Sequence, residues 1–137
     1  MAGNKRIAVF GGVAVAAVVL DQVSKAWART ALAGGPAPLV PGVMDLALVM
    51  NTGAAFSIGS GSTWGFVILA AAICAACAVW VVHEKAMPAP LAAALGAVAG
   101  GGVGNLIDRV IAGQVTDFFA TAFIDFPVFN VADIFVT

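Results

Sequence analysis

The stretch TWGFVILAAAICAACAVWVV, Thr63 to Val82, contains no charged residue. As a helix, a segment of this length is about 30 Å long, which matches the hydrocarbon core of a bilayer. The charged residues of HEK, His83 to Lys85, end the apolar run. The stretch therefore predicts a transmembrane helix over 63–82, and the chain is expected to be a membrane protein.

The composition of the whole chain supports the same conclusion. Of its 137 residues, 62% are hydrophobic and 9% are charged, whereas a soluble domain has about 25% charged residues. The net charge is -1 and no basic run occurs, so no nucleic-acid partner is expected. The length suits one compact helical bundle, and we expect a single membrane-embedded domain over residues 1–137.

The N-terminal apolar run is expected to be a retained helix over about 7–28. On its own this run could be a cleaved secretory signal, with ALAG at 31–34 as the processing site. Charged residues inside DQVSKAWAR, at 21–29, argue against that reading. Asp21 and Lys25 are four residues apart and can neutralise each other within a helix.

The remaining segments complete a predicted bundle of four helices. Glycines and prolines divide 34–62 into short pieces, which we interpret as a small β-sheet or flap outside the membrane. A third span is expected over 90–110, and a fourth begins near 128. Only ten residues remain from that point to the end of the chain, so the fourth helix is expected to be truncated at 137. Glycines give the third span a face that neighbouring helices or a substrate helix can approach closely: Gly96, Gly100, Gly101, Gly102 and Gly104.

Positive charges near the spans predict the orientation. Lys25 and Arg109 are discounted, because each has an acid nearby and is expected inside the bundle. The N-terminal side then carries three cations, and the other side carries Arg29 alone. The N-terminus is therefore expected in the cytoplasm and 34–62 outside. The three cations are Lys5, Arg6 and Lys85.

Polar residues within membrane segments are costly and therefore mark candidate sites. Asp117 and Asp133 lie on either side of Pro127, where the chain can leave the membrane and return, so they can face each other. Two close carboxylates share a proton, activate water and protonate a leaving amine, which is aspartic-protease chemistry. Helix caps, ion pairs and a proton or ion pathway remain open alternatives. Asp125 is expected to be a hydrated turn residue, and Asp108 a structural charge partner.

Other reactive side chains predict no metal or cofactor. Cys74 and Cys77 share a helix face without further metal ligands, so we interpret them as packing residues. His83 is expected in a solvated loop at the membrane boundary, on the face opposite the aspartates, so no Ser–His pair is plausible.

Five motifs together resemble lipoprotein signal peptidase, the bacterial signal peptidase II family. They occur in the family's order and spacing, from residue 21 to the end of the chain: DQVSKAW, NTGAAFS, GGVGNLIDRV, VTDFF and FNVADIF. The resemblance implies a four-helix aspartyl endopeptidase of the bacterial inner membrane, with its active site near the outer face. It also implies a substrate: diacylglyceryl-modified prolipoproteins, cleaved N-terminal to the lipidated cysteine.

The resemblance also implies roles for particular residues. Asp117 and Asp133 match the catalytic aspartates. Residues matching or adjoining the substrate site are Asn51, Gly53, Asn105, Arg109, Phe129 and Asn130. Asp21, Lys25 and Asp108 are expected to support the site structurally. The residues themselves predict an apolar rim from Val115, Phe118, Phe119, Phe126 and Phe129. Interfacial anchoring or core packing remains the open alternative for the aromatic side chains.

Two rival interpretations remain at this point. Members of the family continue through a complete fourth helix, whereas this chain stops four residues after Asp133. We therefore expect an incomplete gene, and a truncated homologue that binds lipidated precursors without cutting them is one rival. A small transport subunit with an aspartate proton relay is the other. The expected partners are prolipoprotein signal peptides and membrane lipid, and a monomer is expected.

Overall fold

The computed structural model describes the chain at residues 2–53, 59 and 61–137. Residues 54–58 and 60 of the predicted flap, which include most of the NTGAAFS motif, lie outside the described part. The elements follow one another as α1 (Ala2–Ala31), β1 (Ala37–Val40), β2 (Met44–Asn51), α2 (Thr63–His83), α3 (Ala89–Ala112), β3 (Val115–Thr121) and α4 (Val131–Val136).

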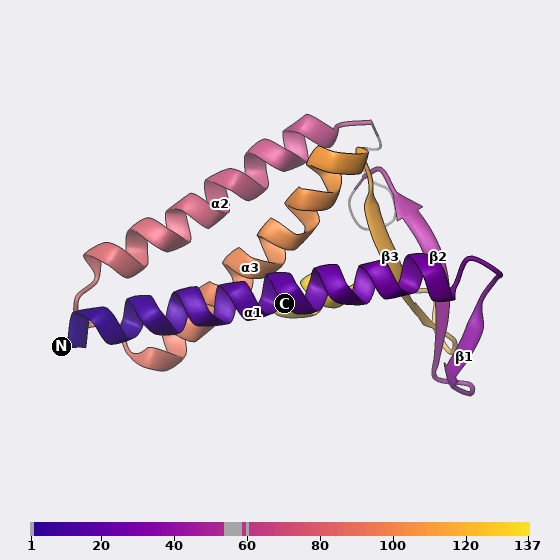
Figure 1. Ribbon diagram of the computed structural model, residues 1–137, viewed down its shortest axis with the longest axis horizontal. Coiled ribbons are helices and arrows are strands. Elements are labelled where there is room, and N and C mark those ends of the chain that lie inside the picture. The colour runs from indigo at the N-terminus through magenta and orange to yellow at the C-terminus, as the bar shows by residue number, and fades with distance from the viewer. Residues whose placement is uncertain (1, 54–58, 60) are drawn as a thin grey trace.

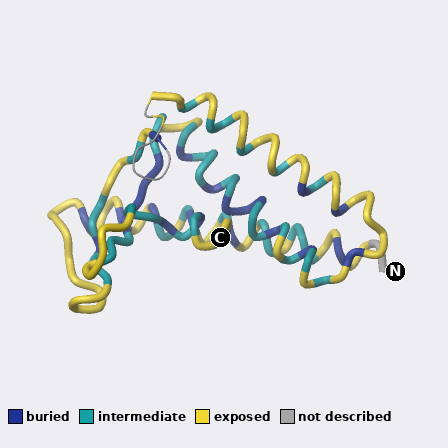
Figure 2. Tube along the Cα trace, turned by 180° about the vertical axis from the view of Figure 1, so that it is seen from behind, coloured by how far each residue is buried: buried dark blue, intermediate teal, exposed yellow. Residues whose placement is uncertain are grey.

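Three helices of the described part are long and apolar enough to cross a membrane: Asn4–Ala31, Thr63–His83 and Ala89–Ala112. They correspond to the three complete spans predicted from the sequence. The fourth element, α4, starts at Val131 and continues to Val136. The predicted class, a helical membrane protein with a small sheet, is confirmed. Figure 2 shows that α2 is exposed along much of its length while α3 is largely covered.

Helix α3 lies between α1 and α2 and packs against both (Figure 1). A Cβ at Gly96, Gly100 or Gly104 would collide with atoms of α1, and one at Gly101 would collide with α4. A Cβ at Gly102 would press on Cys74 of α2. The glycines therefore serve close helix packing. Their faces are occupied by neighbouring helices, so they do not offer a docking surface to a substrate helix.

The sheet lies at one end of the helices (Figure 1) and has the order β1-β2-β3 with antiparallel pairing throughout. Its third strand is not predicted by the sequence. Gly113 ends α3 with a φ of 70°, a left-handed conformation that glycine adopts at little cost. The chain then enters β3 directly, and β3 places Asp117 opposite Val49 of β2.

The sheet is fixed to the helices by an apolar cluster. Ala28 of α1 and Leu32, which directly follows this helix, pack with Leu46 of β2 and Phe118 of β3. Phe118 is 2% exposed, so it belongs to this core and not to the predicted apolar rim. A second cluster, at the opposite end of the bundle, is formed by Val81, Met87 and Ala92.

Arg6 is buried, although its position at the end of the first span predicts a charge exposed at the membrane surface. It was counted among the charges flanking the first span, but its side chain is 5% exposed. Its guanidinium donates to the carbonyl oxygens of Val81 (2.6 Å) and Val82 (2.8 Å). These carbonyls belong to the last turn of α2, where no helical N–H can reach them. Arg6 therefore caps α2 and joins it to α1.

Candidate active site

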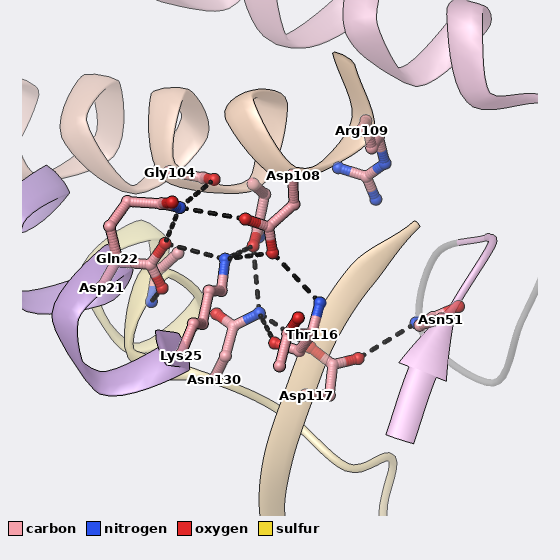
Figure 3. Close-up of polar contacts among 12 residues, drawn as sticks. Asp21, Gln22, Lys25, Asn51, Gly104, Asp108, Arg109, Thr116, Asp117 and Asn130 are labelled. Carbon is pink, nitrogen blue, oxygen red and sulfur yellow. Dashed lines mark hydrogen bonds and ion pairs between the residues drawn. The ribbon is translucent and has the colours of Figure 1, made fainter. Parts of the chain in front are cut away.

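The predicted polar clusters converge at the sheet end of the bundle (Figure 3). Asp21 and Lys25 come from α1, and Asn105 and Asp108 come from α3. Asp117 lies in β3, and Asn130 and Asp133 lie at the start of α4. Segments that are as far apart as 111 positions in sequence are joined here by hydrogen bonds. The sequence predicted this convergence, but not the contacts described next.

Asp117 is 3% exposed and is held from two sides. Asn130 Nδ2 donates to its Oδ1 at 2.7 Å, and Asn51 Nδ2 donates to its Oδ2 at 3.3 Å. Asn51 is the last residue of β2 and pairs with Val115, two residues before Asp117 on β3. The pairing of β2 with β3, a strand that the sequence did not predict, therefore helps to position the Asp117 carboxylate.

Asp133 is positioned by the first turn of α4. The side chain of Asn130 accepts from the backbone N–H of Asp133, and Asp133 Oδ2 accepts from the backbone N–H of Asn130, both at 3.0 Å. This reciprocal pair is a capping box, which satisfies N–H groups that have no partner within the helix. Asn105 Nδ2 donates to the other oxygen, Oδ1, at 3.0 Å. Both oxygens of Asp133 thus face donors.

Asn130 connects the two aspartates. Its Nδ2 faces Asp117 while its Oδ1 caps the helix that carries Asp133. The resemblance placed Asn130 among the substrate-site residues, but the residue is 0% exposed. A side chain that is wholly covered cannot touch a substrate in this conformation. Its contacts show that it holds the two carboxylates in place relative to each other.

A buried ion cluster lies beneath the aspartates. Lys25 Nζ is 2.7 Å from Asp21 Oδ2 and 3.0 Å from Asp108 Oδ2, which confirms the predicted pairing of Asp21 with Lys25. Asp108 precedes Arg109 in the sequence, but its carboxylate forms an ion pair with Lys25. Asp21 Oδ1 also accepts the backbone N–H of Ala132 in α4 at 2.9 Å. The cluster therefore ties α1, α3 and α4 together.

Two residues of the cluster were missed in the sequence. Gln22 donates to Asp108 Oδ1 and to the carbonyl of Gly104, both at 3.0 Å. The backbone N–H of Thr116 donates to Asp108 Oδ2 at 3.0 Å, which fixes the strand next to Asp117. Gln22 could have been found, because an amide beside Asp21 inside an apolar helix also needs partners. Thr116 carried no such signal.

A cavity of about 680 Å³ opens beside both aspartates. Of the predicted substrate-site residues, Asn51, Gly53, Asn105, Arg109 and Phe129 line it. From the predicted rim, Val115 and Phe126 also line it. The rest of its wall is mostly apolar, from Pro127, Val128, Ile134 and Val136. The cavity thus combines an apolar wall with a polar end that holds the carboxylates.

Arg109 reaches from α3 into the mouth of this cavity. Its Nη2 donates to the carbonyl of Gly53 at 3.1 Å, and its guanidinium carbon lies 5.0 Å from the centre of the Phe66 ring. The contact with the ring is a cation–π interaction, which orients a guanidinium without neutralising it. Arg109 therefore keeps its charge at the edge of the site.

The electrostatics of the pair favour a bound proton. Burial raises the pKa of Asp117 from its ordinary value of 3.8 to about 6, and the nearby charge of Asp133 adds to the rise. The hydrogen bonds from Asn51 and Asn130 and the charge of Lys25 oppose it. A carboxyl whose pKa is raised toward neutrality can hold a proton at the pH where acid–base catalysis needs it.

The other predicted reactive residues lie away from this arrangement. Asp125 is exposed on the loop between β3 and α4, as expected of a hydrated turn residue. His83 is exposed at the end of α2. Cys74 donates to the carbonyl of Ala99 in α3, and Cys77 is buried. Within the described residues, no three side chains of the types His, Cys, Asp and Glu are grouped to hold a metal ion.

Comparison with known proteins identifies the family. The family model described as signal peptidase (SPase) II matches residues 13–137. The chain belongs to the signal peptidase II family. Among its relatives, the lipoprotein signal peptidase of Bifidobacterium longum subsp. infantis is 41% identical over 138 residues, covering 96% of this chain and 73% of the relative. That of Symbiobacterium thermophilum is 42% identical over 127 residues, covering 90% and 84%.

Solved structures agree with the signal peptidase II assignment at the level of the fold. A bacterial membrane enzyme solved at 2.3 Å resolution superposes with a TM-score of 0.82 at 32% identity, covering 90% of this chain and 77% of the other. A second, solved at 1.9 Å, gives a TM-score of 0.79 at 32% identity, with coverages of 90% and 82%. The resemblance inferred from the five motifs is therefore confirmed, and the family makes this chain a membrane protease.

Proposed function

We propose that this protein is an intramembrane aspartyl endopeptidase that removes the signal peptide from diacylglyceryl-modified prolipoproteins. Cleavage occurs on the N-terminal side of the lipid-bearing cysteine. One observation carries the proposal: the buried Asp117 and the half-buried Asp133 are bridged by Asn130 and line one largely apolar cavity. Membership of the signal peptidase II family supports the substrate class.

The chemistry needs one ionised and one protonated carboxylate. The ionised group takes a proton from a water molecule, and the water oxygen attacks the scissile carbonyl carbon. The protonated group donates to the carbonyl oxygen as the tetrahedral intermediate forms. Collapse of that intermediate breaks the C–N bond, and the leaving nitrogen receives a proton from the pair. The peptide bond is then replaced by a carboxylate and an amine, without a covalent intermediate.

The cavity fits such a substrate. Its aliphatic and aromatic wall suits an apolar signal peptide and acyl chains, because burying apolar surface is favourable even at a lipid boundary that water reaches. Asn51 and Asn105 line the polar end, where an amide can donate to a peptide carbonyl without bringing a charge. Arg109 can meet a carbonyl oxygen or a headgroup at the rim. We assign these three residues to substrate binding.

The placement in the bacterial inner membrane follows from the three apolar helices and the family. We propose that the N-terminus is cytoplasmic and that the sheet and both aspartates lie at the outer face. The protein acts as a monomer in this proposal, because all the residues proposed for the reaction come from one chain.

The direct test uses the purified protein in detergent micelles with a diacylglyceryl-modified prolipoprotein. Mass spectrometry should detect a free signal peptide and a mature product that begins at the lipidated cysteine. The same precursor without its lipid should be cut at least about tenfold more slowly, since it loses the apolar burial that the cavity offers. EDTA should leave the rate unchanged. Inhibition by EDTA that added metal reverses would contradict an aspartate mechanism, and binding without any cleavage would favour the inactive-homologue reading.

The pH dependence should show the proton on the pair. The raised pKa of Asp117 means that its carboxyl keeps a proton up to about pH 6. As the pH rises through that value the pair loses its acid, so kcat/KM of the free enzyme should fall by about tenfold per pH unit. Asn51→Ala removes a donor that lowers this pKa, so the fall should move to higher pH. Asp125→Asn serves as the control, and a fall that did not respond to Asn51→Ala would assign it to another group.

A further inference from the structure

Lys25 uses all three of its hydrogens in the buried ion cluster. Two point to the carboxylates of Asp21 and Asp108, and the third goes to Asn105 Oδ1 at 2.9 Å. Lys25 is 0% exposed, so no solvent competes for these hydrogens. The ion pairs account for two contacts, and the third connects the cluster to the active site.

That third contact helps to determine which way the Asn105 amide points. An ammonium group has only donors, so the atom facing Lys25 has to be the amide oxygen. Asn130 Nδ2 also donates to this oxygen, at 3.0 Å. The NH₂ group of Asn105 is thereby turned away from Lys25 and donates to Asp133 Oδ1 at 3.0 Å. In the reversed orientation a carbonyl oxygen would face Asp133, which could then be satisfied only by binding a proton.

The two aspartates consequently have different surroundings. Asp133 receives one donor on each oxygen at 3.0 Å, from the backbone of Asn130 and from Asn105. Asp117 receives a short hydrogen bond from Asn130 but only a long one, at 3.3 Å, from Asn51. Hydrogen bonds to a carboxylate favour its charged form. The geometry therefore favours a charged Asp133, and burial of Asp117 favours its protonated form.

We propose that Lys25 is a positioning residue of the proteolytic reaction. By fixing the amide of Asn105, it presents a donor to Asp133 and so directs the shared proton of the pair to Asp117. This inference rests on the proposed aspartyl protease function, and it gives the two carboxylates separate roles. Asp133 is the base that takes the proton from water, and Asp117 is the acid that first protonates the substrate carbonyl.

The charged groups shown around the pair come from two helices, α1 and α3. Helix α1 contributes Asp21 and Lys25, and α3 contributes Asp108 and Arg109. A change in any of these charges would shift the proton affinity of Asp133 simply by electrostatics. The test therefore has to break the hydrogen-bond path without altering the net charge.

The first variant is Asn105→Leu, a neutral replacement that removes the donor to Asp133. The pH profile of kcat/KM should have an acid limb, where the pair of carboxyls loses its first proton. Loss of a hydrogen bond to a charged carboxylate should move this limb upward by about one pH unit or more. If only long-range charge mattered, the limb would not move.

The second variant is Lys25→Met combined with Asp21→Asn. This double change removes one cation and one anion, so the net charge of the cluster stays the same. It removes one of the two donors that fix the Asn105 amide, and Asn130 Nδ2 remains as the other. The acid limb should therefore move upward, but by less than in Asn105→Leu. Adding the double change to Asn105→Leu should give little further shift, because both would break one path. Independent, additive shifts would contradict a path through Asn105.

The matched control is Gln22→Leu. Gln22 donates to Asp108 and Asp21 in the same cluster, but the hydrogen bond from Lys25 to Asn105 remains intact. This variant should lower the thermal unfolding temperature without moving the acid limb. An equal movement in Gln22→Leu would show that any damage to the cluster shifts the limb, and an unmoved limb in Asn105→Leu would overturn the proposal. Full activity after loss of either aspartate would instead refute the protease function itself.

Discussion

Asp117→Asn and Asp133→Asn should each lower kcat/KM for a diacylglyceryl-modified prolipoprotein by about 10³-fold or more. An amide has nearly the shape of the carboxylate, so the cavity and the fold should be retained. It cannot take a proton from water, and it cannot act as an acid near neutral pH. The measurement is the initial rate of signal-peptide release, followed by mass spectrometry over a concentration series.

The double variant distinguishes a catalytic pair from two independent contributions. If Asp117 and Asp133 act on one water molecule, replacing both should cost little more than replacing either. Asp125→Asn is the matched control, because Asp125 is an exposed carboxylate in the same region, and its rate should stay within about twofold. Cleavage near the wild-type rate in either single variant would exclude the pair.

Gly104→Ala should give the second-largest effect, on stability as well as on activity. A Cβ at Gly104 would collide with the carboxylate of Asp21, which binds Lys25 and caps α4. Overpacking alone costs about 1–3 kcal/mol, and disturbing a buried ion pair adds to this. We expect a loss of roughly 3 kcal/mol in the free energy of unfolding, with a matching loss of cleavage.

Gly12→Ala provides the same substitution at a site with space. No atom lies within 4 Å of a Cβ at Gly12 in α1. Alanine is the better helix former by about 0.5–1 kcal/mol, so this variant should be unchanged or slightly more stable. Thermal unfolding in detergent compares the two. Equal stability of Gly104→Ala and Gly12→Ala would show that Asp21 does not need the space at Gly104.

The spans and the pair of aspartates were predictable from the sequence for different reasons. The composition of an uncharged run such as 63–82 is enough to predict a helix, because few other structures satisfy the backbone hydrogen bonds in lipid. Asp117 and Asp133 stood out because a carboxylate is costly in an apolar chain. The resemblance then distinguished these two candidate catalytic residues from Asp125. Physical reasoning alone had predicted only that Asp125 lies in a hydrated turn.

The contacts of the site were not predictable in this way. β3 was missed because its strand character comes from pairing with β2, some 70 positions earlier in the chain. The resemblance predicted that Asn130 contacts the substrate. Only the fold shows that this residue is fully buried. Asp108 stands beside Arg109 in sequence, yet successive helical residues point in different directions. Which polar groups meet depends on how distant segments pack.

The capping box of α4 makes the assembly of the proposed catalytic pair depend on the folding of this helix. The hydrogen bonds that start this helix are the ones that hold Asp133, and Asp21 of α1 must already be in place to receive the N–H of Ala132. A chain that has inserted only its first helices therefore has no aligned pair of carboxylates. The proposed proteolytic activity therefore requires α4 to have folded onto α1.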